Sequence, residues 1–461
     1  MAEKYDVIIV GAGPAGIFAS LELSDFGLSV LLLDKGKDID ARLHAVRGRA
    51  EPCDLVSGFG GAGAFSDGKL TLSTEVGGQL KDLIGVAQTQ TLVDYVDNIY
   101  LRFGAPDNMY GVDLPKVAEL ERKSFIAGLR LIPVKLRHMG TENCGRVLKA
   151  MKLQLSTKVE TRLKTKARNV VVSNGRVKAI ETGDGESLYC DYLILAPGRE
   201  GAEWLFNEAE QLKLGLSTGP VDVGVRVEVP MAVMEELSSV LYESKLEFYS
   251  RSFDDRLRTF CMCPGGEVIM EYTGGSDPVI TVNGMAYQEH KTKNTNFAIL
   301  VSTTFTEPFR EPIAYGKYLA KLANILSGGV LVQRLGDLME GRRSTPARLQ
   351  RSLVEPSLKE ATPGDLSFAL PYRYLTGIIE MLQAMDKLAP GVASPHTLLY
   401  GTEVKFYSSR LKLTPYLETE VENMFAAGDG VGVSRGLVQA SASGVVAARE
   451  ILRRKGKACP D

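Results

Sequence analysis

Three glycines near the start of the chain, Gly11, Gly13 and Gly16, have the spacing that lets a backbone approach phosphate groups. They follow an apolar run at 7–10 and precede a helical pattern that ends near residue 27. The first glycine permits a tight turn, the second lets the backbone approach a pyrophosphate, and the third lets helix and strand pack closely. Asp34 ends the next apolar run, where a carboxylate can bind ribose hydroxyls. The pattern predicts a dinucleotide site; the alternative is a structural glycine turn. Its candidate residues are Gly11, Ala12, Gly13, Pro14, Ala15, Gly16, Asp34 and Lys35.

A second motif near the other end of the chain narrows the choice of dinucleotide. An apolar run at 424–427 leads into Gly428 and Asp429, and small residues follow at 440–444. This resembles the second flavin motif of the glutathione-reductase-like superfamily, the flavoproteins with two dinucleotide-binding domains. The resemblance implies that Asp429 binds the ribityl chain and that the next helix directs its N-terminus at the flavin pyrimidine. An ordinary turn before a helix is the alternative. The candidate residues are Gly428, Asp429, Gln439, Ala440 and Ser441.

A third element lies between these motifs. An apolar run at 192–195 ends in Ala196, Pro197 and Gly198, which resembles the segment where such flavoproteins return to the nucleotide domain. Before it, two turn signals, at 174–175 and 184–185, separate alternating segments typical of β hairpins. The order of these elements predicts FAD as the cofactor.

A further loop holds five glycines between Gly58 and Gly68. It fits the same glycine spacing, but no long helix and acid-terminated strand follow it, so we expect no embedded NAD(P)H domain. Successive backbone N–H groups in such loops can bind anions. In the flavoproteins that this chain resembles, a loop after the second strand crosses the pyrophosphate and the flavin edge. The resemblance implies that Gly63, Ser66 and Asp67 contact the cofactor and that Lys69 stabilises anionic reduced flavin. The alternative is a mobile loop with surface charges.

The resemblance extends over nearly the whole chain. The segments at 59–70, 137–144, 258–268 and 428–444 are similar to a family described as FAD-dependent dehydrogenases. That resemblance implies hydride transfer between flavin N5 and an organic substrate, and it names no substrate.

Two further side chains could assist such a reaction. His138, one of four histidines, lies in a turn-like context and is a candidate proton donor or acceptor. Arg226, on a predicted strand between two valines, is a candidate clamp for an anionic substrate. A structural histidine and an outward-facing strand arginine are the alternatives.

Cys261 and Cys263 form a CxC pair whose side chains share one face of a strand. A redox pair or half of a metal site is one interpretation, and packing is the other. No CxxC or HxxxH supplies further ligands, so we expect no metal site.

Composition sets the broad class. The chain has 461 residues, 24% charged residues, a net charge of −2 and six cysteines. These values favour a two-domain globular protein with reduced thiols and give no argument for nucleic acid or anionic membrane. No apolar run has the length of a membrane span, and the nucleotide motif begins within a few residues of the start. We therefore expect a cytoplasmic protein.

The elements that must position these residues predict an α/β fold. We expect a discontinuous FAD-binding domain at 1–75, 150–215 and 395–461, with a Rossmann-like parallel sheet and a β meander. A helical insertion is expected at 76–149, and a mixed-sheet substrate domain at 216–394.

Three functions fit these expectations. The first is an FAD-dependent oxidoreductase acting on a small molecule, with transient NAD(P)H or a protein electron carrier as partner. The second is a member of the fold without turnover, because Rab GDP-dissociation inhibitors use a related fold for protein binding. The third is a flavin-dependent RNA-modifying enzyme, which the absence of a basic stretch with interleaved aromatics disfavours.

Overall fold

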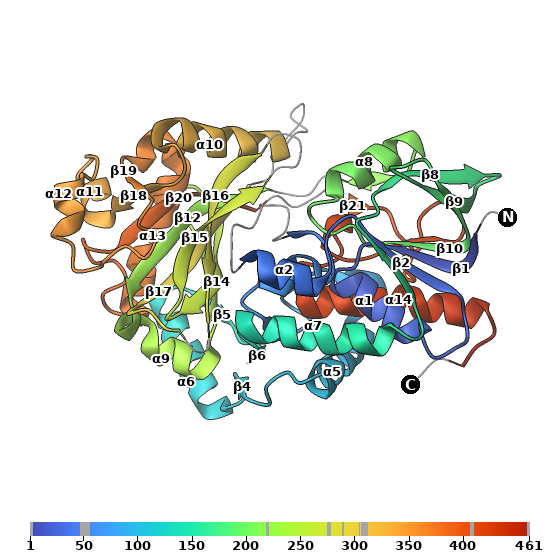
Figure 1. Ribbon diagram of the computed structural model, residues 1–461. Coiled ribbons are helices and arrows are strands. Elements are labelled where there is room, and N and C mark those ends of the chain that lie inside the picture. Colours follow the sequence, from blue (N-terminus) through green and yellow to red (C-terminus); the bar gives the residue numbers. More distant parts are fainter. Residues whose placement is uncertain are drawn as a thin grey trace. The chain divides into compact units, whose positions relative to one another are not determined.

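The computed structural model describes residues 3–46, 56–217, 221–273, 278–287, 290–303, 305, 312–405 and 410–458. The chain forms two compact units, and each combines separate stretches of sequence. The first unit comprises Met1–Asp107, Arg137–Thr218 and Ser408–Asp461, and the second comprises Asn108–Leu136 and Gly219–Tyr407. Each unit contains a large sheet of its own (Figure 1).

The first unit is built on a seven-stranded sheet. Its strands are β1 (Lys4–Val10), β2 (Val30–Asp34), β7 (Glu160–Leu163), β8 (Ala167–Ser173), β9 (Arg176–Thr182), β10 (Ser187–Leu195) and β22 (Met424–Ala426). The order is β7–β2–β1–β10–β9–β8, with β22 also paired to β10. β7, β2, β1, β10 and β22 pair in parallel, whereas β8, β9 and the start of β10 form an antiparallel meander. The predicted α/β class, with a Rossmann-like parallel sheet and a meander, is confirmed.

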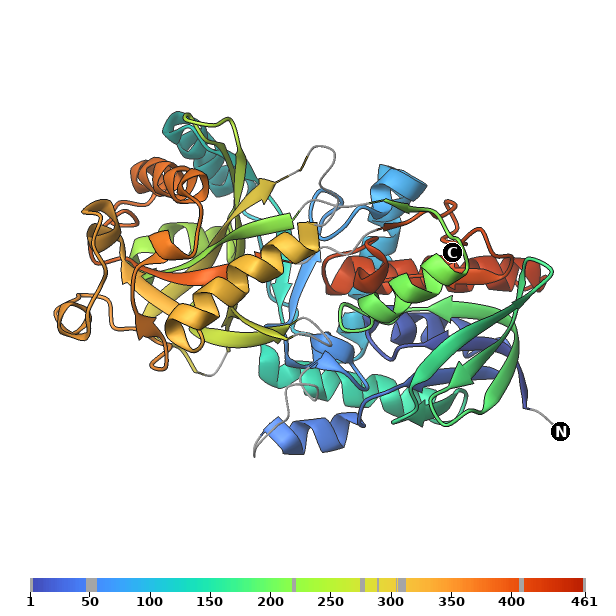
Figure 2. The same cartoon turned by 90° about the horizontal axis from the view of Figure 1, so that it is seen from above.

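The first unit also contains helices, of which the one that follows β1 contacts β1 and β2. They are α1 (Pro14–Leu23), α2 (Ile39–Val46), α4 (Leu80–Ile84), α5 (Val86–Arg102), α7 (Thr141–Leu155), α8 (Ala202–Gln211) and α14 (Leu437–Arg454). The N-terminal α1 and the C-terminal α14 pack side by side (Figures 1 and 2). A Cβ at Gly444 of α14 would lie 2.0 Å from the carbonyl oxygen of Ala15. A glycine at this position therefore lets the two helices approach closely.

The second unit is built on an eight-stranded sheet. Its strands are β5 (Arg130–Ile132), β12 (Val221–Pro230), β13 (Lys245–Tyr249), β14 (Arg256–Pro264), β17 (Asn294–Thr303), β18 (Leu331–Arg334), β19 (Thr362–Pro363) and β20 (Leu398–Lys405). The order is β19–β18–β20–β12–β17–β14–β13–β5. A separate hairpin joins β15 (Glu267–Thr273) to β16 (Val279–Met285). The helices are α6 (Leu114–Ala127), α9 (Met231–Leu241), α10 (Pro312–Ser327), α11 (Leu335–Met339), α12 (Pro346–Gln350) and α13 (Tyr372–Leu388).

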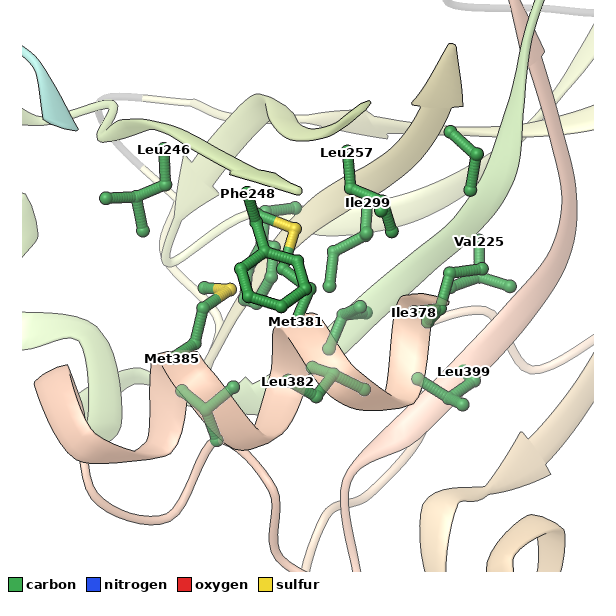
Figure 3. Close-up of a cluster of buried hydrophobic side chains, with 14 of the residues drawn as sticks. Val225, Leu246, Phe248, Leu257, Ile299, Ile378, Met381, Leu382, Met385 and Leu399 are labelled. Carbon is green, nitrogen blue, oxygen red and sulfur yellow. The ribbon is translucent and has the colours of Figure 1, made fainter. Parts of the chain in front are cut away.

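The two faces of this sheet differ in chemistry. Alternate residues of β12, including Val225 and Val227, belong to an apolar cluster that also contains residues of α13 (Figure 3). The intervening residues Asp222, Arg226 and Glu228 are polar and also buried. Since successive strand side chains point to opposite faces, one face is an apolar core and the other carries ionisable groups.

The boundaries of the units differ from the predicted domains in two places. Residues 76–149, expected as one helical insertion, are divided between the units, because β5 pairs with β13 in the second unit. Residues 398–405, expected in the nucleotide domain, form β20 between β12 and β18 of the second unit. In both segments, pairing with strands that are distant in sequence decides to which unit the residues belong. Among the described residues, no helix combines the length and apolarity needed to cross a membrane.

Candidate functional site

The turn between β1 and α1 has the geometry that the glycine spacing predicts. Gly11 has a φ of +108°, and a Cβ there would lie 2.0 Å from the carbonyl oxygen of Ala196. A Cβ at Gly16 would lie 1.9 Å from the carbonyl oxygen of Gly11. Gly13 differs, because the nearest atom to its Cβ position is the Cα of Gly61, at 3.9 Å. Gly11 and Gly16 therefore serve packing, whereas Gly13 keeps space open before the helix.

The N-terminus of α1 is suited to an anion. Gly13 is its N-cap, no side chain caps the helix, and the first turn holds no acidic residue. The N–H groups of a first helical turn lack partners within the helix and bind phosphate readily. Proline at the start of the helix fits the same arrangement, because its missing N–H is not needed there. This terminus fits the pyrophosphate of a dinucleotide.

Asp34 fixes the turn. Its Oδ2 accepts a hydrogen bond from the Ala12 N–H, and its Oδ1 accepts one from the Gly36 N–H, both at 2.8 Å. Each carboxylate oxygen has a second acceptor position. The predicted bond from Asp34 to a ribose is therefore compatible with its structural bonds and stays a prediction. Lys35 is paired with Glu200 at 3.1 Å on the surface.

Arg42 is a residue that sequence reasoning missed. This fully buried side chain of α2 donates to the carbonyl oxygen of Phe59 at 2.6 Å and to that of Gly61 at 2.8 Å. Its guanidinium also lies 5.0 Å from the ring centre of Phe65. Arg42 thus holds the second glycine loop in place, and the Gly60 N–H donates to the carbonyl oxygen of Ala12 at 2.7 Å. The loop consequently contacts the turn before α1.

The end of this loop lies between two helix N-termini. The short helix η1 (Gly61–Phe65) contains Gly63, whose Cβ position is 2.8 Å from Leu437 of α14 and 3.4 Å from Pro14 of α1. The Ser66 hydroxyl donates to the carbonyl oxygen of Gly63 at 3.0 Å. The predicted contacts of Gly63 and Ser66 with a cofactor therefore have a suitable location and remain predictions.

The motif before α14 meets the segment after β10. A Cβ at Gly430 would lie 2.2 Å from the carbonyl oxygen of Gly198, so the two predicted elements are adjacent. Gly428 has a φ of +86°, and its N–H donates to the Ser443 hydroxyl at 2.9 Å. Asp429 accepts a hydrogen bond from Ser434 at 2.6 Å. Ala196 is buried, and its N–H donates to β1.

Gln439 and Ser441 of α14 have protein partners. The Gln439 amide donates to the carbonyl oxygens of Ser73 and Val76 and accepts a long hydrogen bond from the Leu80 N–H. The Ser441 hydroxyl bonds to Tyr100 at 3.2 Å. The Ala440 N–H donates to the carbonyl oxygen of Gly436 at 3.0 Å. The predicted contacts of Gln439, Ala440 and Ser441 with a cofactor stay predictions.

A group of ionisable residues lies at the end of the second glycine loop. Lys69 forms a 2.8 Å ion pair with Asp67, and the two side chains are only 7% and 13% exposed. Burial lowers the pKa of nearby His138 to about 4, although Asp67 partly opposes this shift. His138 is therefore neutral at pH 7 and can either donate or accept a hydrogen bond. Burial likewise raises the pKa of the Cys144 thiol to about 12, which makes it a poor nucleophile.

Arg226 does not have the surroundings of a substrate clamp. The guanidinium donates from Nε to Glu403 at 2.9 Å and from Nη1 to Asn296 at 2.6 Å. The remaining donors bind the carbonyl oxygen of Cys261, Asn283 and the second oxygen of Glu403. Because all five donors have protein partners and the side chain is fully buried, the prediction of direct substrate binding by Arg226 is corrected. Arg226 instead joins three strands and a hairpin of the second unit.

The start of α1, the second glycine loop and the start of α14 together form a cradle for a cofactor. Comparisons with known proteins agree with a cofactor site of this kind. A family described as FAD binding domain matches residues 4–50, and one described as FAD-dependent protein, C-terminal domain-like, matches residues 220–406. An uncharacterized protein of Clostridium beijerinckii is 27% identical over 98% of this chain and 81% of its own length. A digeranylgeranylglycerophospholipid reductase of Methanosarcina mazei is 40% identical over 12% of this chain and 13% of its own.

Among solved structures, L-proline dehydrogenase from P. horikoshii is 13% identical, covers 100% of this chain and 96% of its own, and has a TM-score of 0.43. Glycine oxidase from Geobacillus kaustophilus is 12% identical, covers 98% of this chain and 95% of its own, and has a TM-score of 0.41. The cofactor assignment rests on the two family matches and on the cradle between α1 and α14. The two family matches indicate FAD as the cofactor of this chain.

Proposed function

We propose that the protein is a dehydrogenase that exchanges a hydride with a small organic substrate. Bound FAD supplies the hydride acceptor or donor at N5. The arrangement around the starts of α1 and α14 carries this proposal. Open space at Gly13 lies at the start of α1, α14 packs against α1, and the Gly428 N–H donates to the Ser443 hydroxyl of α14. Asp34, Gly63, Ser66, Asp67, Gly198, Asp429 and the first turn of α14 would hold the cofactor.

His138 and Lys69 are the proposed proton and charge groups of the first unit. A neutral imidazole can accept a proton from a substrate or donate a hydrogen bond to it. The Lys69 ammonium, held by Asp67, would stabilise negative charge near the cofactor. Both side chains lie on or beside the loop that contacts the start of α1, which supports these roles.

A cluster of cations in the second unit supports our proposal for the substrate class. Around the ring of Phe260 lie Arg258, Lys245 and Lys405, at 5.0, 5.3 and 5.8 Å from its centre. Arg258 is paired with Asp222, Lys245 with Glu243, and Lys405 with Glu271 and Glu403. The Arg258 and Lys245 side chains are 17% and 11% exposed. Three cations beside one aromatic ring favour an anionic ligand with a flat apolar part. We propose a small aromatic or unsaturated carboxylate.

The electron partner is proposed to be a separate molecule. The second glycine loop contains the five-residue η1, and β3 (Lys69–Leu72) follows it directly. A second dinucleotide unit needs a long helix and an acid-terminated strand at this point. This local structure supports transient docking of NAD(P)H or of a protein carrier.

An anaerobic titration of the flavin spectrum tests the reaction. We expect the purified protein to be yellow and to be bleached by NADH, NADPH or dithionite. Rapid bleaching by one nicotinamide would identify the donor, whereas reduction by dithionite alone would indicate another carrier. A colourless protein that does not take up added FAD would refute the proposal and favour a binding role without turnover.

A ligand titration tests the substrate class. We expect benzoate, but not benzamide, to perturb the flavin spectrum or to give a binding heat. The variants Lys245→Gln and Arg258→Gln should weaken benzoate binding about tenfold each, because each removes one cation beside the ligand. Lys123→Gln is the matched control, since Lys123 pairs with Glu119 and Glu236 on α6 and α9. Equal binding of the acid and the amide would contradict the anionic class.

A further inference from the structure

Two cysteines of the second unit lie closer together than a regular strand allows. Cys261 and Cys263 are separated by one residue on β14, and alternate positions on an extended strand are about 6–7 Å apart. Their Sγ atoms are 3.9 Å apart. The register of β14 against β17 shifts between Phe260 and Cys263, and Cys261 has a φ of +47°. A β bulge therefore brings the two thiols together.

The neighbours of the pair hold this bulge. The N–H of Met262 donates to Glu243 at 3.3 Å, and the Met262 side chain is fully buried in the apolar core. The Gly266 N–H donates to the carbonyl oxygen of Cys263 at 3.1 Å, and a Cβ at Gly266 would lie 2.7 Å from that of Cys263. A positive φ at a residue other than glycine is maintained only where the surroundings enforce it, and such positions cluster at functional sites.

A cation, Arg226, lies beside the pair and is itself ion-paired with Glu403. The Arg226 guanidinium donates to the carbonyl oxygen of Cys261 at 3.1 Å and interacts electrostatically with both cysteine side chains. A nearby cation stabilises a thiolate, which is the reactive form of cysteine. Cys261 is partly exposed whereas Cys263 is buried. Cys261 is thus placed to attack a reagent and Cys263 to resolve the product.

We propose that Cys261 and Cys263 are a redox-active dithiol that closes to a disulfide by exchange with a small-molecule disulfide. The Cys261 thiolate attacks one sulfur of the small disulfide, forms a mixed disulfide and releases one small thiol. The Cys263 thiolate then attacks Cys261 Sγ and releases the second small thiol. The two protein thiols are oxidised, the small disulfide is reduced to two thiols, and the protons pass from the cysteines to the released thiolates. Closure needs the sulfurs to approach from 3.9 Å to about 2.05 Å.

The test is mass spectrometry of the full-length protein after incubation with oxidised glutathione, acid quenching, alkylation and digestion. The peptide that holds both cysteines should lose two hydrogens and resist alkylation until a reductant is added. At equilibrium, the ratio of protein disulfide to protein dithiol is proportional to the glutathione disulfide concentration divided by the square of the glutathione concentration. A tenfold rise in that quotient should therefore raise the ratio of protein disulfide to dithiol tenfold. This assay needs neither bound FAD nor turnover, so its outcome is independent of the proposed dehydrogenase reaction.

Variants separate the attacking role of Cys261 from the resolving role of Cys263. Cys263→Ser should accumulate a glutathione adduct on Cys261, and Cys261→Ser should form little adduct, because Cys263 is buried. Cys190→Ser, which removes a buried thiol of the first unit, should keep the disulfide. Circular dichroism checks that each variant is folded, and the wild-type measurement stands without them. Absence of the disulfide at excess glutathione disulfide, or thiols that react only after a metal chelator is added, would overturn the proposal.

Discussion

Replacing Gly13 with alanine tests whether this glycine is needed for cofactor binding rather than for backbone packing. The added Cβ would have its nearest neighbour at 3.9 Å, and Gly13 has a φ of −80°, which alanine adopts without strain. The apo protein should therefore keep its stability within about 1 kcal/mol, or gain slightly, because alanine restricts the unfolded chain. The methyl group would occupy the space in front of the N-terminus of α1, where the pyrophosphate is expected.

The loss of FAD affinity follows from the contacts that the methyl group would prevent. A hydrogen bond to a charged group contributes about 1.5–3 kcal/mol, which corresponds to roughly 10- to 150-fold in affinity. The dissociation constant, measured by flavin fluorescence on apo protein, should rise by that factor. Thermal unfolding should then show a smaller gain in stability on adding FAD, because ligand stabilisation scales with the ratio of ligand concentration to dissociation constant.

Two further glycines complete the experiment. Gly183→Ala is the matched control, since its added Cβ would make only ordinary contacts at 3.6 Å, and we expect no change in stability or FAD affinity. Gly16→Ala places a Cβ 1.9 Å from a carbonyl oxygen and should destabilise the apo protein by about 1–3 kcal/mol. A Gly13→Ala protein that binds FAD normally, or whose apo form is as unstable as Gly16→Ala, would refute the assignment of the pyrophosphate site.

Three other changes have defined outcomes. Because burial holds the pKa of His138 near 4, the unfolded state takes up a proton more readily, so stability should fall by up to about 3 kcal/mol as pH falls from 6.5 to 4. Urea unfolding should show that His138→Gln reduces this fall, unlike His44→Gln at an exposed position. Arg226→Met should destabilise the protein by about 3–5 kcal/mol because it removes both guanidinium bonds to buried Glu403, which keeps only Lys405 as an ion-pair partner, and adding Glu403→Gln should restore part of the lost melting temperature. Arg42→Gln should release the second glycine loop, seen as faster proteolysis at 58–68 and weaker FAD binding; unchanged cleavage would contradict this role.

The nucleotide motif could be predicted because its causes are local. The conflict that excludes a side chain at Gly16 involves the carbonyl oxygen of Gly11, five residues earlier. The partner of Asp34 is the Ala12 N–H, within the same strand–helix–strand unit. Such contacts recur wherever a backbone makes this turn, so spacing alone indicates them. The sequence did not indicate the role of Arg42, although the carbonyl oxygens that it binds lie only 17 and 19 residues further along the chain. A lone arginine in a short helix has no characteristic spacing that would predict these partners.

The second unit could be predicted only in part, since its strands pair across long stretches of sequence. Alternation identified β12 and placed Arg226 between two valines. It could not identify Glu403, which lies 177 residues away on β20, or assign β20 to this sheet. All residues of β20 are buried, so the strand resembles the core strands of the nucleotide domain to which it was assigned.

Because both faces of β12 are buried, a loss of activity in a variant of this strand does not by itself identify a substrate contact. Polar residues that alternate with valines are normally assigned to solvent, but here Asp222, Arg226 and Glu228 are buried. Buried charges need partners: Arg258 pairs with Asp222, Glu403 with Arg226, and Tyr400 donates to Glu228. A substitution on this face removes a structural partner as well as any substrate contact. Only a variant that weakens ligand binding at unchanged stability can therefore identify a substrate residue, and the partly exposed Lys245 and Arg258 are the positions where that separation is most attainable.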